Sequence, residues 1–269
     1  LKQRQKLNRQ NRTIYRFKRM YVMQIMLSNN TGQKVKNLWD KYPGRFGCLF
    51  GIDGWRNVDM PYALDNGRFA ATTKGKLWEV EKFKFLLDKA VKCKASPVFV
   101  VVPDVVANKK ATLEHWEIWT AKSHWFGKYK FPLAFVVQDG MIPEDVPDSA
   151  DWVFIGGSPK WKRANIWRFC NKFKNVHVGG INTVRGLWVC HKSGAKSIDG
   201  TGWFRGDEVR WRGLLQYLYR TENALGEKQG RLFEMYEADA MGARFYQKYA
   251  EELKEDCIRG YSGEGITLK

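Results

Sequence analysis

The stretch Ser197-Ile198-Asp199-Gly200-Thr201-Gly202-Trp203-Phe204-Arg205 combines a short apolar strand, a carboxylate at its end and a glycine-rich turn. A carboxylate in this position is a candidate nucleophile, and the alternative is an aspartate that caps the helix after the turn. Similar strand ends recur upstream. Four more apolar runs finish in aspartate, in glutamine followed by aspartate, or in bare glycine backbone, at residues 61–65, 97–104, 133–139 and 152–157.

Apolar runs this dense are typical of strands that are buried on both faces of a parallel sheet. Helical patterns separate them, with caps at Asn108, at Ser158 before Pro159, and near Asn182 and Thr183. Ligands bind at the carboxyl ends of strands in such folds, so five strand ends would present polar groups at one place. The eight expected strands lie at residues 21–27, 46–51, 61–65, 97–104, 133–138, 152–157, 176–180 and 196–199. The sequence therefore predicts an α/β fold, a single-domain (β/α)8 TIM-type barrel.

The chain is strongly basic and rich in aromatic residues. Its 269 residues include 46 Lys and Arg against 28 Asp and Glu, a formal charge of +18, with 12 Trp, 11 Tyr and 16 Phe. Basic groups bind phosphates and aromatic rings stack on bases, which makes nucleic acid the leading partner. The alternative is a generally basic protein, because net charge alone does not name a ligand. No apolar run approaches the roughly 18 residues of a membrane span, so a soluble protein without a membrane partner is expected.

The five cysteines are Cys48, Cys93, Cys170, Cys190 and Cys257. They lie far apart, no pair has C-x-x-C spacing, and four ligands at zinc-finger spacing cannot be assembled. This pattern predicts a reducing cytoplasm and no bound metal.

Two terminal segments flank the predicted barrel of residues 20–222. Residues 1–19 carry eight basic side chains and no acidic one, which favours a flexible basic arm over a transit-like leader. Residues 223–269 are expected to form a helical segment that packs on the barrel, with an amphipathic helix at about residues 232–256. The sequence leaves open whether the chain forms a homodimer.

The helix that begins after Ser158 carries several basic side chains. Its inward residues are expected to be Trp161, Ala164, Trp167 and Cys170. Its outward residues are expected to be Lys160, Lys162, Arg163, Arg168 and Lys172. The predicted contacts to a nucleic-acid backbone combine this helix with the segment after Asp199: Lys160, Lys162, Arg163, Trp203 and Arg205. The alternative for the helix is an ordinary solvated face.

Six motifs in this order carry a resemblance to a known family. They are Leu-Asp-Asn-Gly-Arg-Phe at 64–69, Val-Pro-Asp-Val-Val at 102–106, Val-Val-Gln-Asp-Gly at 136–140, Phe-Ile-Gly-Gly-Ser at 154–158, Val-Gly-Gly-Ile-Asn at 178–182 and Ser-Ile-Asp-Gly-Thr at 197–201. With them, the chain from about residue 21 to 220 resembles the tRNA-guanine transglycosylase superfamily. It looks most like the phage and bacterial DpdA-type transglycosylases, which put 7-deazaguanines into DNA.

One departure from the family affects the expected substrate. The tRNA-modifying members carry a Cys-rich zinc subdomain after the barrel, whereas residues 221–269 contain only Cys257. A barrel without the zinc subdomain weakens the expectation of a tRNA substrate and favours DNA.

The resemblance implies a base exchange that needs no cofactor. Asp199 would be the nucleophile that attacks C1′ and releases guanine, and Asp65 would be the second catalytic carboxylate, which transfers the proton. Four further residues match the family's base-binding positions: Asp104 and Gln138 as base-reading side chains, and Gly156 and Gly157 as backbone donors. A carboxylate nucleophile suits this chemistry, because a covalent sugar–enzyme intermediate keeps the sugar cation away from water.

The hydrogen-bonding groups of guanine agree with these roles. Its N1–H and exocyclic amine are donors that Asp104 can accept, and the Gln138 amide and the Gly157 N–H are donors suited to O6. Each has a structural alternative, namely a helix cap, a loop contact and a turn. Phe69 is a candidate for stacking on the base or a core residue. His177 is a candidate for lining the base pocket, although a single His in a strand is more often a core residue.

The resemblance thus implies a glycosyltransferase that exchanges guanine in DNA for a free 7-deazaguanine base through a covalent Asp–sugar intermediate. The target nucleotide would be flipped out or single-stranded, because the barrel rim cannot reach a base inside a duplex. The alternatives are the same exchange on tRNA and a non-catalytic nucleic-acid-binding barrel; the charge disfavours a carbohydrate-cleaving barrel. The expected location is cytoplasmic, in the host cytoplasm if the gene is phage-encoded.

Overall fold

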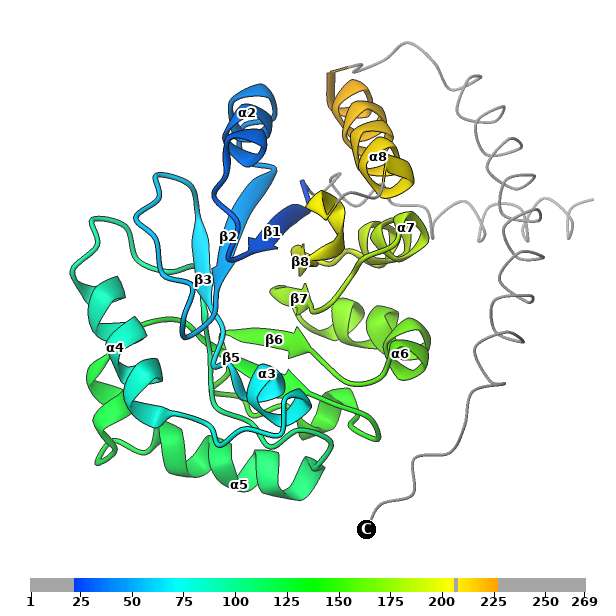
Figure 1. Ribbon diagram of the computed structural model, residues 1–269. Helices are drawn as coiled ribbons and strands as arrows, with labels where there is room; N and C mark the ends of the chain where they lie inside the picture. The colour runs from blue at the N-terminus through cyan, green and yellow to red at the C-terminus, as the bar shows by residue number, and fades with distance from the viewer. Residues whose placement is uncertain (1–21, 206–207, 227–269) are drawn as a thin grey trace, which may run out of the picture. The chain divides into compact units, whose positions relative to one another are not determined.

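Eight parallel strands form a closed barrel in the computed structural model of the protein, which describes residues 22–205 and 208–226 (Figure 1). In chain order the strands are β1 (Gln24–Ser28), β2 (Phe46–Phe50), β3 (Tyr62–Leu64), β4 (Val100–Val101), β5 (Leu133–Val137), β6 (Trp152–Ile155), β7 (Val176–Val178) and β8 (Ser197–Asp199). Each strand pairs with the next, and β8 closes the barrel against β1, with Met26 opposite Asp199. The predicted (β/α)8 barrel is confirmed.

Helices lie between most pairs of successive strands in the chain, and the last helix follows β8 (Figure 1). They are α2 (Gln33–Lys41), α3 (Arg68–Thr73), α4 (Val80–Val91), α5 (Lys109–Thr120), α6 (Pro159–Lys172), α7 (Val184–Ser193) and α8 (Glu208–Gly226). Short 3-10 turns lie at Trp125–Lys128, Pro143–Asp145 and Gly202–Phe204. The chain divides into two compact units between Tyr219 and Arg220, and the second unit is described only for the end of α8.

The predicted helix caps are confirmed. The Asn108 side chain accepts a hydrogen bond from the Ala111 N–H at 3.0 Å, and Ser158 Oγ accepts one from the Trp161 N–H at 3.3 Å. Thr183, rather than Asn182, caps α7. Each cap pairs an N–H that the first helical turn would otherwise leave without a partner, so polar residues directly after the strands also start the helices.

The barrel interior is filled by every second residue of the strands. Its core consists of Met26, Leu49, Ala63, Phe99, Val101, Ala134 and Val136. The alternate residues of the same strands face the helices and form the larger core layer. Because side chains alternate, Asp65 and Asp199 continue the interior series of Ala63 and Ser197, which directs both carboxylates toward the mouth of the barrel.

The expected inward face of α6 is correct for Trp161 and Cys170 and wrong for Ala164 and Trp167. Its buried residues are Ile166, Phe169 and Cys170, whereas Ala164 is exposed and Trp167 is 55% exposed. The inward face of α6 runs through Lys162, Ile166 and Phe169 at helical spacing. Because this face begins with a lysine, the apolar pattern in the sequence did not indicate it. Helix α3 was also not expected, because its six residues bury no side chain and have no apolar period.

Two terminal predictions lie outside the described residues. These are the basic arm of residues 1–19 and, beyond the end of α8, the helical segment of residues 223–269. Across the residues that the structure describes, no helix has the length and apolar character to cross a membrane.

Candidate active site

Three aspartates gather at the carboxyl ends of the strands. Asp65 directly follows β3, Asp104 follows β4, and Asp199 is the last residue of β8. The negative charges of Asp199 and Asp104 both act on Asp65, so the three side chains share one site. The barrel therefore brings together the two carboxylates predicted to be catalytic and the one predicted to read the base.

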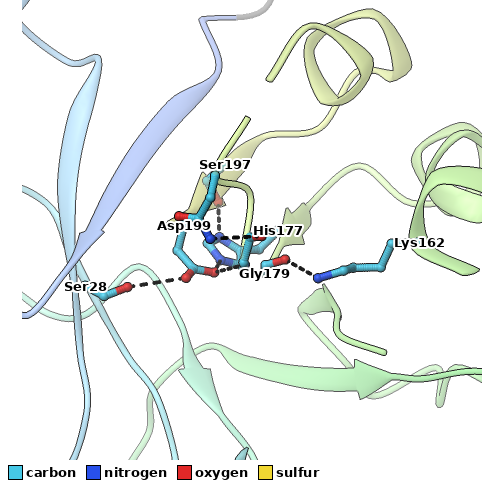
Figure 2. Close-up of polar contacts among 8 residues, drawn as sticks. Ser28, Lys162, His177, Gly179, Ser197 and Asp199 are labelled. Carbon is cyan, nitrogen blue, oxygen red and sulfur yellow. Dashed lines mark hydrogen bonds and ion pairs between the residues drawn. The ribbon is translucent and has the colours of Figure 1, made fainter. Parts of the chain in front are cut away.

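The two oxygens of Asp199 have different environments (Figure 2). Oδ1 accepts a hydrogen bond from the Gly180 N–H at 3.0 Å and lies 3.1 Å from His177 Nε2. Among the described residues, Oδ2 accepts only a long bond, 3.3 Å, from Ser28 Oγ. The carboxylate is therefore held through Oδ1, and Oδ2 is the oxygen with acceptor capacity left for a ligand.

His177 is a fully buried support for Asp199. Its Nδ1 lies 2.8 Å from Ser197 Oγ, and its ring packs between Phe99 and Phe154. In the tautomer with the proton on Nε2, His177 donates to Asp199 Oδ1 and its Nδ1 accepts from the Ser197 hydroxyl. With no exposed surface, His177 does not line a base pocket in this structure but orients the carboxylate.

Asp65 is a carboxyl group of the site whose pKa is strongly raised. Its pKa is raised from 3.8 to about 7, mainly by burial and also by the charges of Asp199 and Asp104, while hydrogen bonds from the Gly67 and Asn66 backbone oppose the rise. At neutral pH a substantial fraction of Asp65 is therefore protonated, beside a carboxylate that is held by hydrogen-bond donors. Two carboxyl groups with such different environments are suited to separate roles as acid and nucleophile.

Asp104 is held in place by two amides. Its Oδ1 accepts a hydrogen bond from Asn66 Nδ2 at 2.9 Å, and its Oδ2 accepts one from Gln138 Nε2 at 2.7 Å. Burial raises the pKa of Asp104, and the bond from Asn66 opposes that rise. Both oxygens retain lone pairs, so a ligand that donates hydrogen bonds can still bind.

The Gln138 amide is used within the protein. Besides Asp104, its Nε2 contacts the Val105 carbonyl and Thr112 Oγ1, while its Oε1 accepts from the Ala107 N–H. The side chain is 3% exposed. Gln138 thus supports Asp104 in this structure and does not offer a free donor to a ligand.

The two predicted backbone donors differ from each other. The Gly156 N–H bonds to the Val137 carbonyl at 2.9 Å as part of the barrel. Gly157 is exposed, with a φ of 77°, and a Cβ there would lie 2.3 Å from Asp139 Oδ1, so only glycine fits. The Gly157 N–H bonds to no acceptor in the described part of the chain, which leaves it available.

Phe69 and the residues predicted to contact nucleic acid differ in how exposed their side chains are. Phe69 is 67% exposed on α3 beside Asp65, so it is not a core residue. Lys160, Arg163 and Arg205 are exposed. Trp203, in contrast, is 1% exposed in the core, and its predicted contact with nucleic acid is wrong because the ring packs between barrel and helices.

The prediction that the Lys162 side chain points outward is also wrong. Its Nζ donates to the Gly179 carbonyl at 2.6 Å, and the side chain lies on the inward face of α6 near Asp199 (Figure 2). Burial lowers the pKa of Lys162, and the charge of Asp199 opposes that fall. Lys162 is therefore a part of the site and not a surface contact.

Sequence reasoning missed four supporting residues, Ser28, Asn66, Ser197 and Thr112. Ser197 lies two positions before Asp199, so strand alternation already places both on one face. Ser28 ends β1, the strand that pairs with β8. The supports of Asp104 come from different strands and loops, and no local pattern signals them.

No group of three or more His, Cys, Asp or Glu side chains among residues 22–205 and 208–226 is arranged to hold a metal ion. A scan of the chain against models of known protein families gives no match, and a search of curated protein sequences gives none either.

Proposed function

We propose that the protein is a DNA-guanine transglycosylase, which exchanges a guanine in DNA for a free 7-deazaguanine base through a covalent bond between Asp199 and the sugar. The observation that carries this proposal is the pair of carboxyl groups at the mouth. Asp199 is held by donors on Oδ1, and Asp65 has a pKa of about 7 beside it. This combination supplies a nucleophile and a proton donor at neutral pH.

The exchange proceeds in two balanced steps. Asp199 Oδ2 attacks C1′, the electron pair of the C1′–N9 bond leaves with guanine, and Asp65 gives its proton to the departing base. The incoming base then loses a proton to the Asp65 carboxylate, its nitrogen attacks C1′, and the bond to Asp199 breaks. Each step restores the protonation state that the other needs, so no cofactor is consumed.

The base would be read by acceptors and donors beside this pair. Asp104 accepts from N1–H and the exocyclic amine, and its two amide supports keep it in position. The Gly157 N–H is the donor suited to O6, because the Gln138 amide is occupied. Phe69, exposed on α3 four residues after Asp65, offers an apolar ring on which a flipped base can stack.

A basic rim supports DNA as the partner. Lys160, Arg163, Arg185 and Arg205 lie at the starts of α6 and α7 or after β8, at the mouth end of three successive β/α units. All four side chains are exposed, and none forms an ion pair within the described part of the chain. Unpaired cations beside the acidic mouth would bind the phosphates on either side of the target nucleotide.

The test is nucleoside analysis of DNA after incubation with the protein and a set of 7-deazaguanine bases, with tRNA in parallel. The proposal expects a 7-deazaguanine nucleoside in DNA, released guanine in equal amount, and neither product with Asp199→Asn. Exchange on tRNA alone would replace DNA by RNA as the substrate. Salt-sensitive binding of DNA without base exchange under any condition would favour the alternative, a non-catalytic nucleic-acid-binding barrel.

A further inference from the structure

The peptide unit between Gly179 and Gly180 lies between two opposite charges. Its carbonyl oxygen, on Gly179, accepts a hydrogen bond from Lys162 Nζ at 2.6 Å. Its N–H, on Gly180, donates to Asp199 Oδ1 at 3.0 Å. The C=O and N–H of a trans peptide point in opposite directions, so one rigid plane joins the ammonium to the carboxylate (Figure 2).

This arrangement requires glycine at both positions. A Cβ on Gly179 would lie 2.7 Å from Cε1 of Phe154 and 3.3 Å from Asp199 Oδ1. Gly180 has a φ of 69°, in the left-handed region that favours glycine, and a Cβ there would meet Lys162 Nζ at 3.4 Å. Two glycines in a row thus let the peptide plane turn between the two side chains.

Lys162 is positioned for this role by its own helix. It lies on the inward stripe of α6, half-buried, one turn before Ile166. The ionisable groups whose charges act on it are Asp199 at the end of β8, Asp139 after β5 and Cys190 on α7. The ammonium group is therefore held at the Gly179 carbonyl, whereas Lys160 and Arg163 on the same helix are exposed.

We infer that Lys162 is a positioning residue for Asp199, which acts through the Gly179–Gly180 peptide unit. The ammonium fixes and polarises the peptide, the Gly180 N–H then holds Oδ1, and Oδ2 is left as the attacking oxygen. A hydrogen bond from a polarised donor to an ionised acceptor is stronger than one between neutral groups. The catalytic meaning of this arrangement rests on the proposed transglycosylase function, whereas the positioning itself does not.

The positioning is tested without any activity, by NMR of protein labelled with 15N-glycine. Gly180 is exposed, and an exposed glycine amide without an acceptor exchanges freely. The inference expects a protected, downfield-shifted Gly180 N–H in the wild type and a resonance that moves in Asp199→Asn. An unprotected Gly180 amide in the wild type would overturn it, whether or not any variant folds.

The variant test compares Lys162→Met with Lys172→Met on the same helix. Lys172 pairs with Glu144 on the surface, about 15 Å farther along the helix at 1.5 Å per residue. Lys162→Met is expected to move the Gly180 resonance upfield and to speed its exchange roughly 3- to 10-fold, the effect of one hydrogen bond. Lys172→Met should leave the resonance in place, and Lys162→Arg, which retains a charged donor, should restore it in part. If the chemical shift and the exchange rate of the Gly180 N–H do not change in a folded Lys162→Met variant, the inference is contradicted.

A base-exchange assay tests the effect of Lys162 on catalysis. Lys162→Met is expected to lower kcat with little change in the KM for DNA, whereas loss of an exposed phosphate contact such as Arg163 raises KM. A raised KM with unchanged kcat in Lys162→Met would indicate that Lys162 binds DNA and does not position Asp199. If no variant or wild type exchanges bases while the Gly180 resonance responds as expected, the proposed function fails and the positioning of Asp199 stands.

Discussion

Asp65→Asn should remove a large part of the pH dependence of folding. In the folded protein burial raises the pKa of Asp65 from 3.8 to about 7. Between these values the unfolded chain has released the proton and the folded chain still holds it, so stability falls as pH rises through this window. At about 1.36 kcal/mol per pKa unit, the ionised carboxyl group costs the wild type up to about 4 kcal/mol above pH 7.

Most of this cost, about 3 kcal/mol, develops between pH 5 and pH 8. Asp65 is partly exposed by surface area, and solvent screening lowers the measured value below that ceiling. The assay is guanidinium unfolding of the wild type and Asp65→Asn at several pH values across this range. The free energy of unfolding of the variant should exceed that of the wild type by an amount that grows with pH.

The control is Asp148→Asn, which changes an exposed carboxylate. It should reproduce the wild-type profile. Parallel profiles for the wild type and Asp65→Asn would refute the reasoning, because they would mean that Asp65 ionises alike in the folded and unfolded chains. Asp65 could then not be the proton donor at neutral pH.

Three further changes test other parts of the site. Ser197→Ala leaves the buried Nδ1 of His177 without its partner and should lower the free energy of unfolding by about 1–3 kcal/mol in denaturant titrations; an unchanged midpoint would argue against the Ser197–His177 bond. Gly179→Ala forces a methyl group against the Phe154 ring and should cost about 1–3 kcal/mol by the same assay. The double change Lys160→Met and Arg163→Met should weaken DNA binding at all sequences and make the slope of log K against log salt less negative by about 2; an unaltered slope would remove both residues from the DNA-binding surface.

The sequence was sufficient for the barrel and for the two carboxylates. The apolar and β-branched run at residues 97–102 favours a strand buried on both faces, and the structure has β4 within it at Val100–Val101. The polar residue after such a run marks the strand end. The carboxyl ends of parallel strands meet at one mouth, so Asp65 and Asp199 could be placed together before any coordinates. The helix caps at Asn108 and Ser158 followed from local chemistry alone.

The remaining side chains depended on contacts that no local pattern contains. A charged residue at the start of a helix is usually solvated, whereas the Lys162 ammonium donates to the Gly179 carbonyl after β7 and is affected by the charge of Asp199 at the end of β8. Gln138 was expected to face a ligand, yet its amide is taken up by Asp104 and the loop after β4. Trp203 lies next to glycines and an arginine as a stacking residue would, and only the packing of the barrel shows that it is core.

The most direct test of the central claim is to trap the covalent intermediate. A guanine-containing oligonucleotide is incubated with the protein without any free base, the mixture is denatured and digested, and the modified peptide is sequenced by mass spectrometry. The account predicts a sugar-linked oligonucleotide on Asp199, lost on adding a 7-deazaguanine base and not formed by Asp199→Asn. An adduct on another residue, or guanine released by water with no adduct, would contradict it.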